Sequence, residues 1–502
     1  MDFKTFLSLE WEIMGPEFII LGVIILTSLL DLFMPKQADR KVIGWIGIAG
    51  VIGAAVSLAL LIDHHAASIL YDTFRLDSFS KAFKLLLLIG AGLVLFLAVN
   101  YEPKEGIDYK GEFYYLFLAA LLGAMMMASS GDLITLFTGL ELLSISSYIL
   151  AGMRKKHLRS NESAMKYVIN GGISTAVTLF GMSYVYGLTG TTNLKAMSTY
   201  LTRNLDEQHI YLLGLAFFMI FIGLSFKLAS APFHMWAPDV YEGAPTPVTA
   251  FLGVVSKTAG FVLLVRVLLV IFLSIPADGG PMSDPLLIKV QDYMAFLAGA
   301  TMIIGNVIAL RQRNVKRLFA YSSIAHAGYL LVAVTTVSTL FETLWFYLLA
   351  YLFMNMGAFA VIQLLTEKAD SEDISHFSGL YRRSPVLAVA MAIFILSLAG
   401  IPGTAGFIGK LNIFMGALIT TPAHYVLASV MIATTIVSYY YYFGIMTQMF
   451  FRPAEHGEKV MMQAGIGVVI GVCAVATILF GIMPNLALDF LHTNFDFTDL
   501  FQ

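Results

Sequence analysis

Charged residues are scarce in this chain. Only 13% of its 502 residues are Asp, Glu, Lys or Arg, whereas soluble proteins carry about 25%. Hydrophobic residues make up 58%, so the surface itself must be largely apolar. This composition is typical of a protein that crosses a membrane many times. The net charge of -3 is too small to indicate nucleic acid or another polyanion as a partner.

Cysteine is almost absent as well. The single Cys473 cannot form an internal disulfide, and it cannot hold an iron–sulfur cluster, which needs about four ligands. It lies in an apolar run, where we interpret it as a filler of apolar space. Asp2, Glu10 and Glu12 precede the first apolar segment, whereas a secretory signal begins with basic residues. We therefore expect the first segment to remain as a membrane span.

Long apolar segments occupy most of the chain. Backbone groups in lipid must be hydrogen-bonded internally, and the segments lack the alternation of barrel strands, so we expect helices. The sequence predicts an all-α integral membrane protein with about 14 transmembrane helices, forming one polytopic domain over 1–502 without a soluble domain. The expected spans lie near 16–34, 42–62, 79–99, 113–130, 132–152, 163–187, 208–231, 248–274, 288–310, 318–337, 341–365, 385–420, 425–450 and 461–483.

The basic residues of the loops are unevenly distributed. Loops after odd-numbered spans hold 18 lysines and arginines, and loops after even-numbered spans hold 4, or 6 if Lys81 and Lys84 are included. Positively charged loops stay in the cytoplasm. We therefore expect both termini to face outward from a bacterial cell membrane.

Two of the expected spans are interrupted. The seventh contains Ala-Pro-Phe-His at 231–234, and the twelfth runs through 385–420 with Ile-Pro-Gly-Thr-Ala-Gly at 401–406. Broken helices at corresponding places in two halves are typical of transporters with inverted repeats, because they form the ion path. We predict two inverted five-helix repeats, at 113–274 and 286–450. N-terminal helices at 1–112 precede them, and a C-terminal helix at 451–502 follows.

Four charged residues stand inside expected spans: Glu141 in the fifth, Lys227 in the seventh, Lys257 in the eighth and Lys410 in the twelfth. Each costs about 2.5–3.5 kcal/mol at mid-bilayer on insertion scales, so such residues usually face the protein interior and act there. Two alternatives to a role in the interior remain. The side chains of Lys227 and Lys410 can extend to the membrane–water interface, and Glu141 and Lys257 can form a purely structural ion pair.

Two histidines complete the candidate set. His326 lies in the tenth span, where a neutral core histidine is an equal alternative, and His234 follows Pro232, where a bond to a helix end is equally plausible. Arg266, on the far side of its helix from Lys257, is expected to reach toward the interface.

Buried lysines suit proton transport for a physical reason. Desolvation destabilises a charged ammonium group, and a nearby carboxylate stabilises it again. A Glu–Lys pair followed by further lysines can therefore take up and release protons in turn, and histidine can relay between them. We expect proton transfer, without a metal or a bound cofactor, at Glu141, Lys227, Lys257, Lys410, His326 and His234.

Five blocks of sequence resemble the subunit N family of bacterial NADH–quinone oxidoreductase, respiratory complex I. They are GDLITLFTGLELLSISSYILAG (131–152), SAMKYVINGGISTAVTLFGMSYVYGLTG (163–190), FKLASAPFHMWAPDVYEGAPTPVTAFLGVVSKTAGFVLLVR (226–266), NVKRLFAYSSIAHAGYLL (314–331) and LSLAGIPGTAGFIGKLNIF (396–414). Subunits L and M and the multisubunit sodium–proton antiporters share the general pattern. Lys410 favours N over M, which has glutamate there, and the end at Gln502 favours N over L, which has a further long helix.

The resemblance implies one proton-translocating subunit of an NADH-driven translocase. In the family, a fifth-span glutamate pairs with a seventh-span lysine, which carries over to Glu141 and Lys227; the remaining lysines carry over to Lys257 and Lys410. The flavin (FMN), the iron–sulfur clusters, and the NADH and quinone sites are implied to lie in partner subunits. The implied partners are the other membrane subunits of a hetero-oligomer and the lipid bilayer.

Two other functions remain open at this stage. A cation–proton antiporter subunit driven by ion gradients would use the same buried charges, and a membrane spacer would use none. Purification of the chain with its native partners distinguishes the complex I subunit from the antiporter subunit, since flavin and iron accompany only complex I. Loss of NADH-driven pumping on Lys227→Ala or Lys257→Ala would exclude the spacer.

Overall fold

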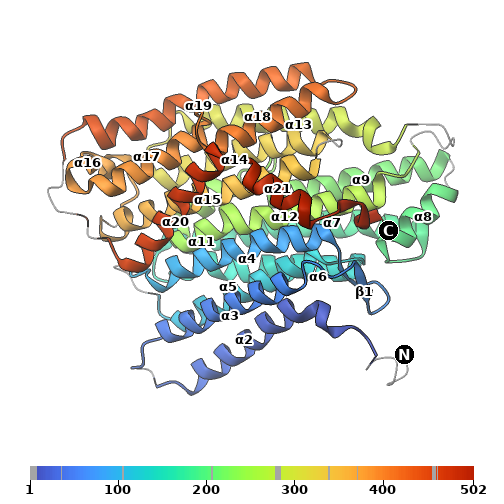
Figure 1. Cartoon of the computed structure of the whole chain (residues 1–502), viewed down its shortest axis with the longest axis horizontal. Helices are drawn as coiled ribbons and strands as arrows, with labels where there is room; N and C mark the ends of the chain where they lie inside the picture. The colour runs from blue at the N-terminus through green and yellow to red at the C-terminus, as the bar shows by residue number, and fades with distance from the viewer. Residues whose placement is uncertain are drawn as a thin grey trace.

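The computed structural model describes residues 8–35, 37–103, 107–204, 207–276, 284–336, 340–369, 371–454, 460 and 462–501. Thirteen helices in these ranges are long and apolar enough to cross a membrane, and two shorter apolar helices, α17 (Pro385–Ala399) and α18 (Ala405–Ile419), follow one another as the halves of one more span. This arrangement agrees with the prediction of about 14 spans. The long helices run side by side through the bundle (Figure 1).

The spanning helices are α2 (Gly15–Phe33), α3 (Lys41–Leu60), α4 (Ser78–Val99), α5 (Lys110–Ala128), α6 (Leu133–Ala151), α7 (Leu158–Thr189), α9 (Glu207–Leu228), α11 (Thr246–Phe251) continued by η2 (Leu252–Ser256), α12 (Lys257–Val267) and η3 (Leu268–Phe272), α13 (Leu286–Ala309), α14 (Val315–Thr335), α15 (Leu340–Ala369), α17 (Pro385–Ala399), α18 (Ala405–Ile419), α19 (Tyr425–Phe451) and α20 (Ala464–Ile482). The short elements are η1 (Trp11–Met14), β1 (Ala67–Ile69), β2 (Phe74–Leu76), α8 (Leu194–Asn204), α10 (Trp236–Gly243), η5 (Ile374–Phe377), α16 (Leu380–Arg383), α21 (Asn485–Asn494) and η6 (Phe497–Phe501).

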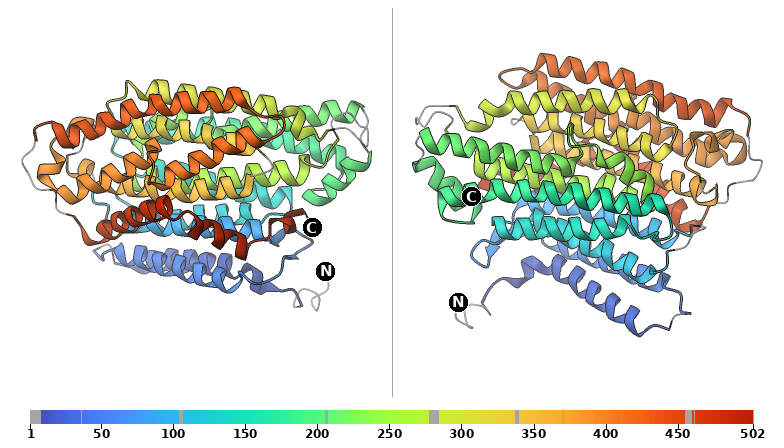
Figure 2. Two further views of the ribbon diagram at one scale, coloured as in Figure 1. Left: turned by 45° about the horizontal axis from the view of Figure 1, so that its top comes forward. Right: turned by 180° about the vertical axis from the view of Figure 1, so that it is seen from behind.

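The helices differ sharply in how far they are buried. In the most apolar 18-residue stretch of each helix, 94% of the residues of α14 and of the α11–η3 segment are buried, and all of those of α15 are buried. The corresponding fractions for α2 and α7 are only 33% and 28%. Large apolar side chains of the outer helices are exposed, as Phe33 at 80% shows. Contiguous apolar surface of this kind faces lipid or other membrane subunits. In both views of Figure 2, α2 and α3 lie at one edge of the bundle, and α13 and α19 lie at the opposite edge.

Both expected interruptions are present. Helix α9 ends at Leu228, and α10 begins at Trp236 after the break that contains Pro232. Helix α17 ends at Ala399, and α18 begins at Ala405. The positive φ of Gly400, +83°, ends α17 in a left-handed cap, a conformation that glycine adopts without strain. The prediction of discontinuous seventh and twelfth spans is confirmed.

The same helix pairings occur in both groups of five spans. Helix α5 packs on α6 as α13 packs on α14, α7 packs on α9 as α15 packs on α17 and α18, and α5 contacts α12 as α13 contacts α19. Because five spans separate the two groups, corresponding helices run in opposite directions. The recurrence fits an inverted repeat, while the exact repeat boundaries stay a prediction.

One small element departs from the all-helical expectation. Strands β1 and β2 form an antiparallel hairpin between α3 and α4, with Ala67 paired to Leu76. Leu70, Tyr71 and Asp72 form its turn with positive φ angles. Three-residue strands are too short for a periodic signal in the sequence.

Both ends of the described chain meet the N-terminal end of α4. Asp499 in η6 accepts hydrogen bonds from the backbone N–H and the hydroxyl of Ser78, both at 2.8 Å. Near the start of α2, Glu17 lies 2.5 Å from Lys84. The two ends therefore lie on the same side of the bundle, as an even number of spans requires.

Candidate functional site

Lys257 lies in the middle of the Thr246–Phe272 span, which is almost entirely buried. The π-helical turn η2 immediately precedes it, and such turns often occur at functional sites because they change which face a side chain occupies. The Lys257 side chain is 2% exposed. Its ammonium donates to the backbone oxygen of Ser323 at 2.6 Å and to the Ser323 hydroxyl at 2.5 Å. Lys257 is therefore a buried ammonium held by α14.

The hydroxyl of Ser323 extends this contact to two tyrosines. Tyr351 donates to Ser323 Oγ at 3.0 Å, and the Tyr241 hydroxyl lies 3.2 Å from the same atom. All three side chains are buried. A hydroxyl both donates and accepts, so Lys257, Ser323 and the tyrosines form a polar connection through an apolar interior.

His326 lies one helical turn beyond Ser323 on α14. Its Nδ1 lies 2.6 Å from the Tyr347 hydroxyl, and its Nε2 lies 3.2 Å from the Tyr442 hydroxyl. Its ring centre is 5.3 Å from that of Tyr351, which also contacts Ser323. The histidine is 1% exposed and has a hydroxyl at each nitrogen. This environment suits both a neutral core histidine and a proton relay.

Lys410 occupies the second helix break. Its ammonium donates to the carbonyls of Leu398 and Ala399, at 2.9 and 3.2 Å. These belong to the last turn of α17, whose carbonyls lack helical partners and form the negative end of the helix dipole. A Cβ at Gly400 would lie 2.9 Å from Lys410 Cδ, so the lysine stem needs a glycine there. The side chain is 6% exposed, so Lys410 does not reach for the interface as a lipid-facing lysine would.

Lys410 also borders other parts of the site. Its Nζ lies 4.9 Å from the centre of the Tyr329 ring, on the same helix as His326. A cavity of about 230 Å³ between α18 and α19 is lined by Lys410, Phe414 and Thr435, and Thr435 donates to the Tyr329 hydroxyl at 3.3 Å. Lys410 therefore borders both the buried tyrosines and this cavity.

Lys227 is in the last turn of α9 and points inward. Its side chain is 6% exposed, and its ammonium donates to Ser144 Oγ at 3.2 Å. Its stem passes over Gly260 of α12, where a Cβ would lie 3.3 Å from Lys227 Cγ. The alternative in which Lys227 extends to the membrane interface is wrong for this structure. The ring of Tyr167, whose buried hydroxyl has no hydrogen-bond partner in the described ranges, lies 6.0 Å from the ammonium.

Glu141 is half-buried on α6 and accepts a hydrogen bond from Thr175 at 2.9 Å. Ser144, the partner of Lys227, follows three residues later and so shares its helix face. Within the part of the chain that the structure describes, Lys227 has no ion pair shorter than 4.0 Å. Glu141 and Lys227 are thus neighbours across Ser144 rather than a direct salt bridge.

His234 stands apart from the other five candidates. It lies in the break between α9 and α10, and its carbonyl accepts from the backbone N–H of Ala237 at 3.0 Å. Its Nδ1 is buried without a hydrogen-bond partner among the described residues. The structure therefore groups Lys257, His326 and Lys410, places Glu141 beside Lys227, and leaves His234 separate.

The expectation for Arg266 was wrong. The side chain is 1% exposed, and its Nη2 donates to both carboxylate oxygens of Asp77, at 2.8 and 2.9 Å. Asp77 caps α4 and is itself 1% exposed. Its carboxylate holds the guanidinium inside the protein, so Arg266 does not extend to the interface.

Hydroxyl residues of the site were absent from the sequence-based set. One signal was available: polar positions on α14 recur every three or four residues within an otherwise apolar helix, which places them on one face. Tyrosines in apolar runs gave no such signal, because aromatic residues in such runs are also common in the hydrophobic core. The residues concerned are Tyr241, Ser322, Ser323, Tyr329, Tyr347, Tyr351 and Tyr442.

A polar cavity of about 630 Å³ lies at the helix ends that carry the basic loops. Arg154, Glu242, Lys316 and Glu372 line it together with Thr246, the first residue of α11. The Lys316 ammonium lies 2.6 Å from Glu372. The cavity therefore brings a charged, water-accessible surface to the start of the helix that carries Lys257.

Comparisons with known proteins agree with this architecture. Residues 130–437 match the family model described as NADH:quinone oxidoreductase/Mrp antiporter, TM. NADH-quinone oxidoreductase subunit N of Geobacillus sp. (strain WCH70) is 63% identical over 98% of this chain and all of the relative. Subunit N of Anoxybacillus flavithermus is 62% identical over the full length of both.

Solved structures show the same fold. A chain of respiratory complex I from Thermus thermophilus with bound aureothin is 32% identical, with a TM-score of 0.78 over 94% of this chain and 98% of that chain. A chain of the Mrp complex from Dietzia sp. DQ12-45-1b has a TM-score of 0.83 over 98% of this chain and 99% of that chain. Its sequence identity is 19%, so this comparison establishes likeness of fold alone. With family match, full-length identity and fold in agreement, the chain belongs to the NADH-quinone oxidoreductase subunit N family of antiporter-like membrane subunits.

Proposed function

We propose that this chain is a proton-translocating membrane subunit of NADH–quinone oxidoreductase, and that Glu141, Lys227, Lys257, His326 and Lys410 transfer the proton. The observation that carries the proposal is the connection from Lys257 through Ser323 to buried tyrosines around His326. Buried lysines are costly in a membrane unless they act or are paired.

The polar groups are suited to passing a proton along. A hydroxyl can both accept and donate a hydrogen bond. Ser323 Oγ accepts from Lys257 and from Tyr351, so a proton passes along the connection when the hydroxyl hydrogens turn. Such networks also strengthen their own bonds in a low-dielectric interior. The hydroxyl of Ser144 accepts a hydrogen bond from Lys227, and Glu141 lies one turn away on the same helix. His234 is left out of the proposed path, because it contacts none of the others through a described hydrogen bond.

Two cavities suggest how the path meets its surroundings. The charged cavity at Thr246 lies among the basic loops that are predicted to be cytoplasmic, so it suits proton uptake. The cavity beside Lys410 is lined mostly by apolar side chains, with the hydroxyls of Thr435 and Tyr439 among them, and lies next to the onward end of the proposed path. In this orientation both termini face the outside of a bacterial cell membrane.

The redox chemistry is assigned to partners. A lone buried Cys473 cannot hold an iron–sulfur cluster, so we place the FMN, the clusters and the quinone in other subunits of a hetero-oligomeric complex. The full-length likeness to subunit N relatives favours this redox-driven role over the alternative of a gradient-driven cation–proton antiporter.

The test uses inside-out vesicles that contain the assembled complex. NADH oxidation and NADH-driven proton uptake are measured together, and Lys257→Ala is compared with Lys156→Ala, whose lysine is 79% exposed. We expect a lower ratio of protons to electrons for Lys257→Ala and an unchanged ratio for Lys156→Ala. An unchanged ratio in assembled Lys257→Ala complex would overturn the proposal.

A further inference from the structure

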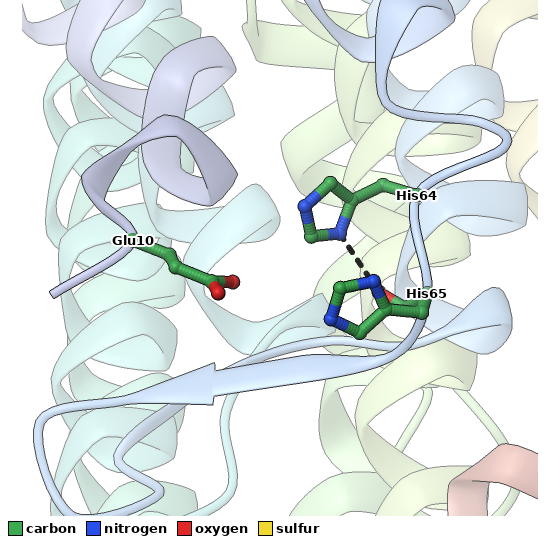
Figure 3. Close-up of side chains that lie close together, drawn as sticks. All are labelled: Glu10, His64 and His65. Atoms are coloured by element: carbon green, nitrogen blue, oxygen red, sulfur yellow. Dashed lines mark hydrogen bonds between the residues drawn. The ribbon is translucent and has the colours of Figure 1, made fainter.

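Glu10, His64 and His65 come together in space (Figure 3). They lie near the N-terminal end of α4, since Lys81 of that helix donates to the backbone oxygen of His64. Glu10 directly precedes η1, and the two histidines lie in the connection between α3 and β1. One ligand atom from each residue lies within 4.8 Å of the other two. None of the three belongs to the proton-transfer set.

The hydrogen bond of His64 fixes which of its nitrogens is free. Its Nδ1 lies 2.9 Å from the backbone oxygen of His65, and a carbonyl oxygen can only accept, so Nδ1 carries the proton. The lone pair is then on Nε2. Metal-binding histidines are typically oriented in this way, with the second ring nitrogen donating to a carbonyl or carboxylate.

The other two groups are adjacent to His64. The rings of His64 and His65 are stacked, with centres 4.5 Å apart and planes 18° apart, so one ring must turn before both lone pairs point at the same ion. The carboxylate of Glu10 points toward the two rings (Figure 3). Glu10 and His65 are exposed and His64 is partly exposed, so an ion from solution can reach all three.

We propose that Glu10, His64 and His65 form a binding site for a transition-metal dication of the Zn²⁺ class. Imidazole nitrogens suit Zn²⁺, Cu²⁺ and Ni²⁺, whereas Mg²⁺ and Ca²⁺ prefer oxygen ligands. Two histidines and one glutamate are a known zinc ligand set, and water takes the fourth position. Ligands around tetrahedral zinc lie about 3.4 Å apart. The ligand atoms, now within 4.8 Å of one another, would therefore draw together as the exposed His65 ring turns out of the stack.

The site joins two parts of the fold. It would link the start of the first span to the connection between α3 and β1, whose backbone oxygens at Ile62 and His64 accept hydrogen bonds from Lys81 of α4. Metal binding would therefore brace the first three spans against one another. The sequence predicted no metal site, because Glu10 and the histidines flank different spans.

The test uses the full-length chain in lipid nanodiscs, titrated with ZnCl₂ by isothermal titration calorimetry. His64→Gln/His65→Gln and the single variant His65→Gln are compared with His492→Gln, whose exposed histidine pairs with Glu342 instead. We expect the double variant to lose one zinc per chain. His65→Gln and Glu10→Gln should weaken that site about ten-fold or more, and His492→Gln should retain it.

A second readout identifies the ligands directly. Zinc X-ray absorption of the loaded wild-type chain should show two imidazole ligands, and the signal should fall to one in His65→Gln. Equal zinc stoichiometry and affinity in wild type and His64→Gln/His65→Gln would overturn the proposal, as would a spectrum without imidazole.

Discussion

The ammonium of Lys257 donates to both the carbonyl and the hydroxyl oxygen of Ser323, at 2.6 and 2.5 Å. Lys257 belongs to the first of the two predicted repeats, and Ser323 belongs to the second. The contact therefore joins the two predicted repeats inside the buried core. A change in either half can act on the same ammonium group.

Ser323→Ala should show whether the Ser323 hydroxyl is needed for proton transfer or whether the Ser323 carbonyl alone is enough to hold Lys257. The carbonyl bond to Lys257 remains, while the hydroxyl bonds to Lys257 and Tyr351 are lost. A hydrogen bond to a charged group contributes about 1.5–3 kcal/mol, so we expect proton uptake to be slower by roughly ten-fold or more at unchanged assembly. The rate of NADH-driven proton uptake is measured in vesicles that contain the assembled complex. Ser429→Ala, which removes an exposed hydroxyl on α19, is the control. Wild-type uptake in Ser323→Ala would remove Ser323 from the path.

Ser144→Ala should weaken the coupling of Lys227 to Glu141. Lys227 bonds to the Ser144 hydroxyl, and Glu141 lies one turn away on the same helix. We expect Lys227→Ala and Glu141→Gln to lower the proton-to-electron ratio strongly and Ser144→Ala to lower it less. The double variant Ser144→Ala/Lys227→Ala should match Lys227→Ala alone. Additive losses would show that Ser144 acts independently of Lys227.

Gly400→Val should displace Lys410. The position has φ of +83°, and a Cβ would meet the lysine stem at 2.9 Å. The left-handed conformation alone costs about 1–2 kcal/mol for a residue with a side chain. We expect a lower thermal unfolding midpoint and reduced pumping. Gly187→Ala, in a helix with open space around it, should change neither property. Normal pumping in Gly400→Val would show that Lys410 does not need its present position.

Arg266→Ala should destabilise the chain severely. Removal of one partner of a buried ion pair leaves the other charge unpaired, here Asp77, at a cost of about 3–5 kcal/mol. Thermal unfolding in detergent measures the loss. The double variant Asp77→Leu/Arg266→Met removes both charges and should recover much of the stability. If the double variant unfolds as early as Arg266→Ala, the hydrogen bonds of Asp77 within α4 are the larger contribution.

The sequence was sufficient for the spans and their breaks, because long apolar runs and prolines act locally. It was also sufficient to single out Lys257 and Lys410, because a charge in an apolar run is conspicuous in any arrangement. It failed for Arg266, whose partner Asp77 lies at the start of a different span. It missed the tyrosines around His326 because an aromatic residue in an apolar run looks the same whether or not its hydroxyl is bonded. Those contacts depend on how helices pack, which one sequence does not encode locally.

The π-helical turn at Leu252–Ser256 has a consequence for the whole helix that follows it. A π turn accommodates one residue more than an α turn, and one residue corresponds to about 100° of rotation. A chain shorter by one residue here could keep a continuous helix, yet it would present a different side of α12 to α14. Which residue meets Ser323 is thus decided by chain length upstream as much as by the chemistry of lysine.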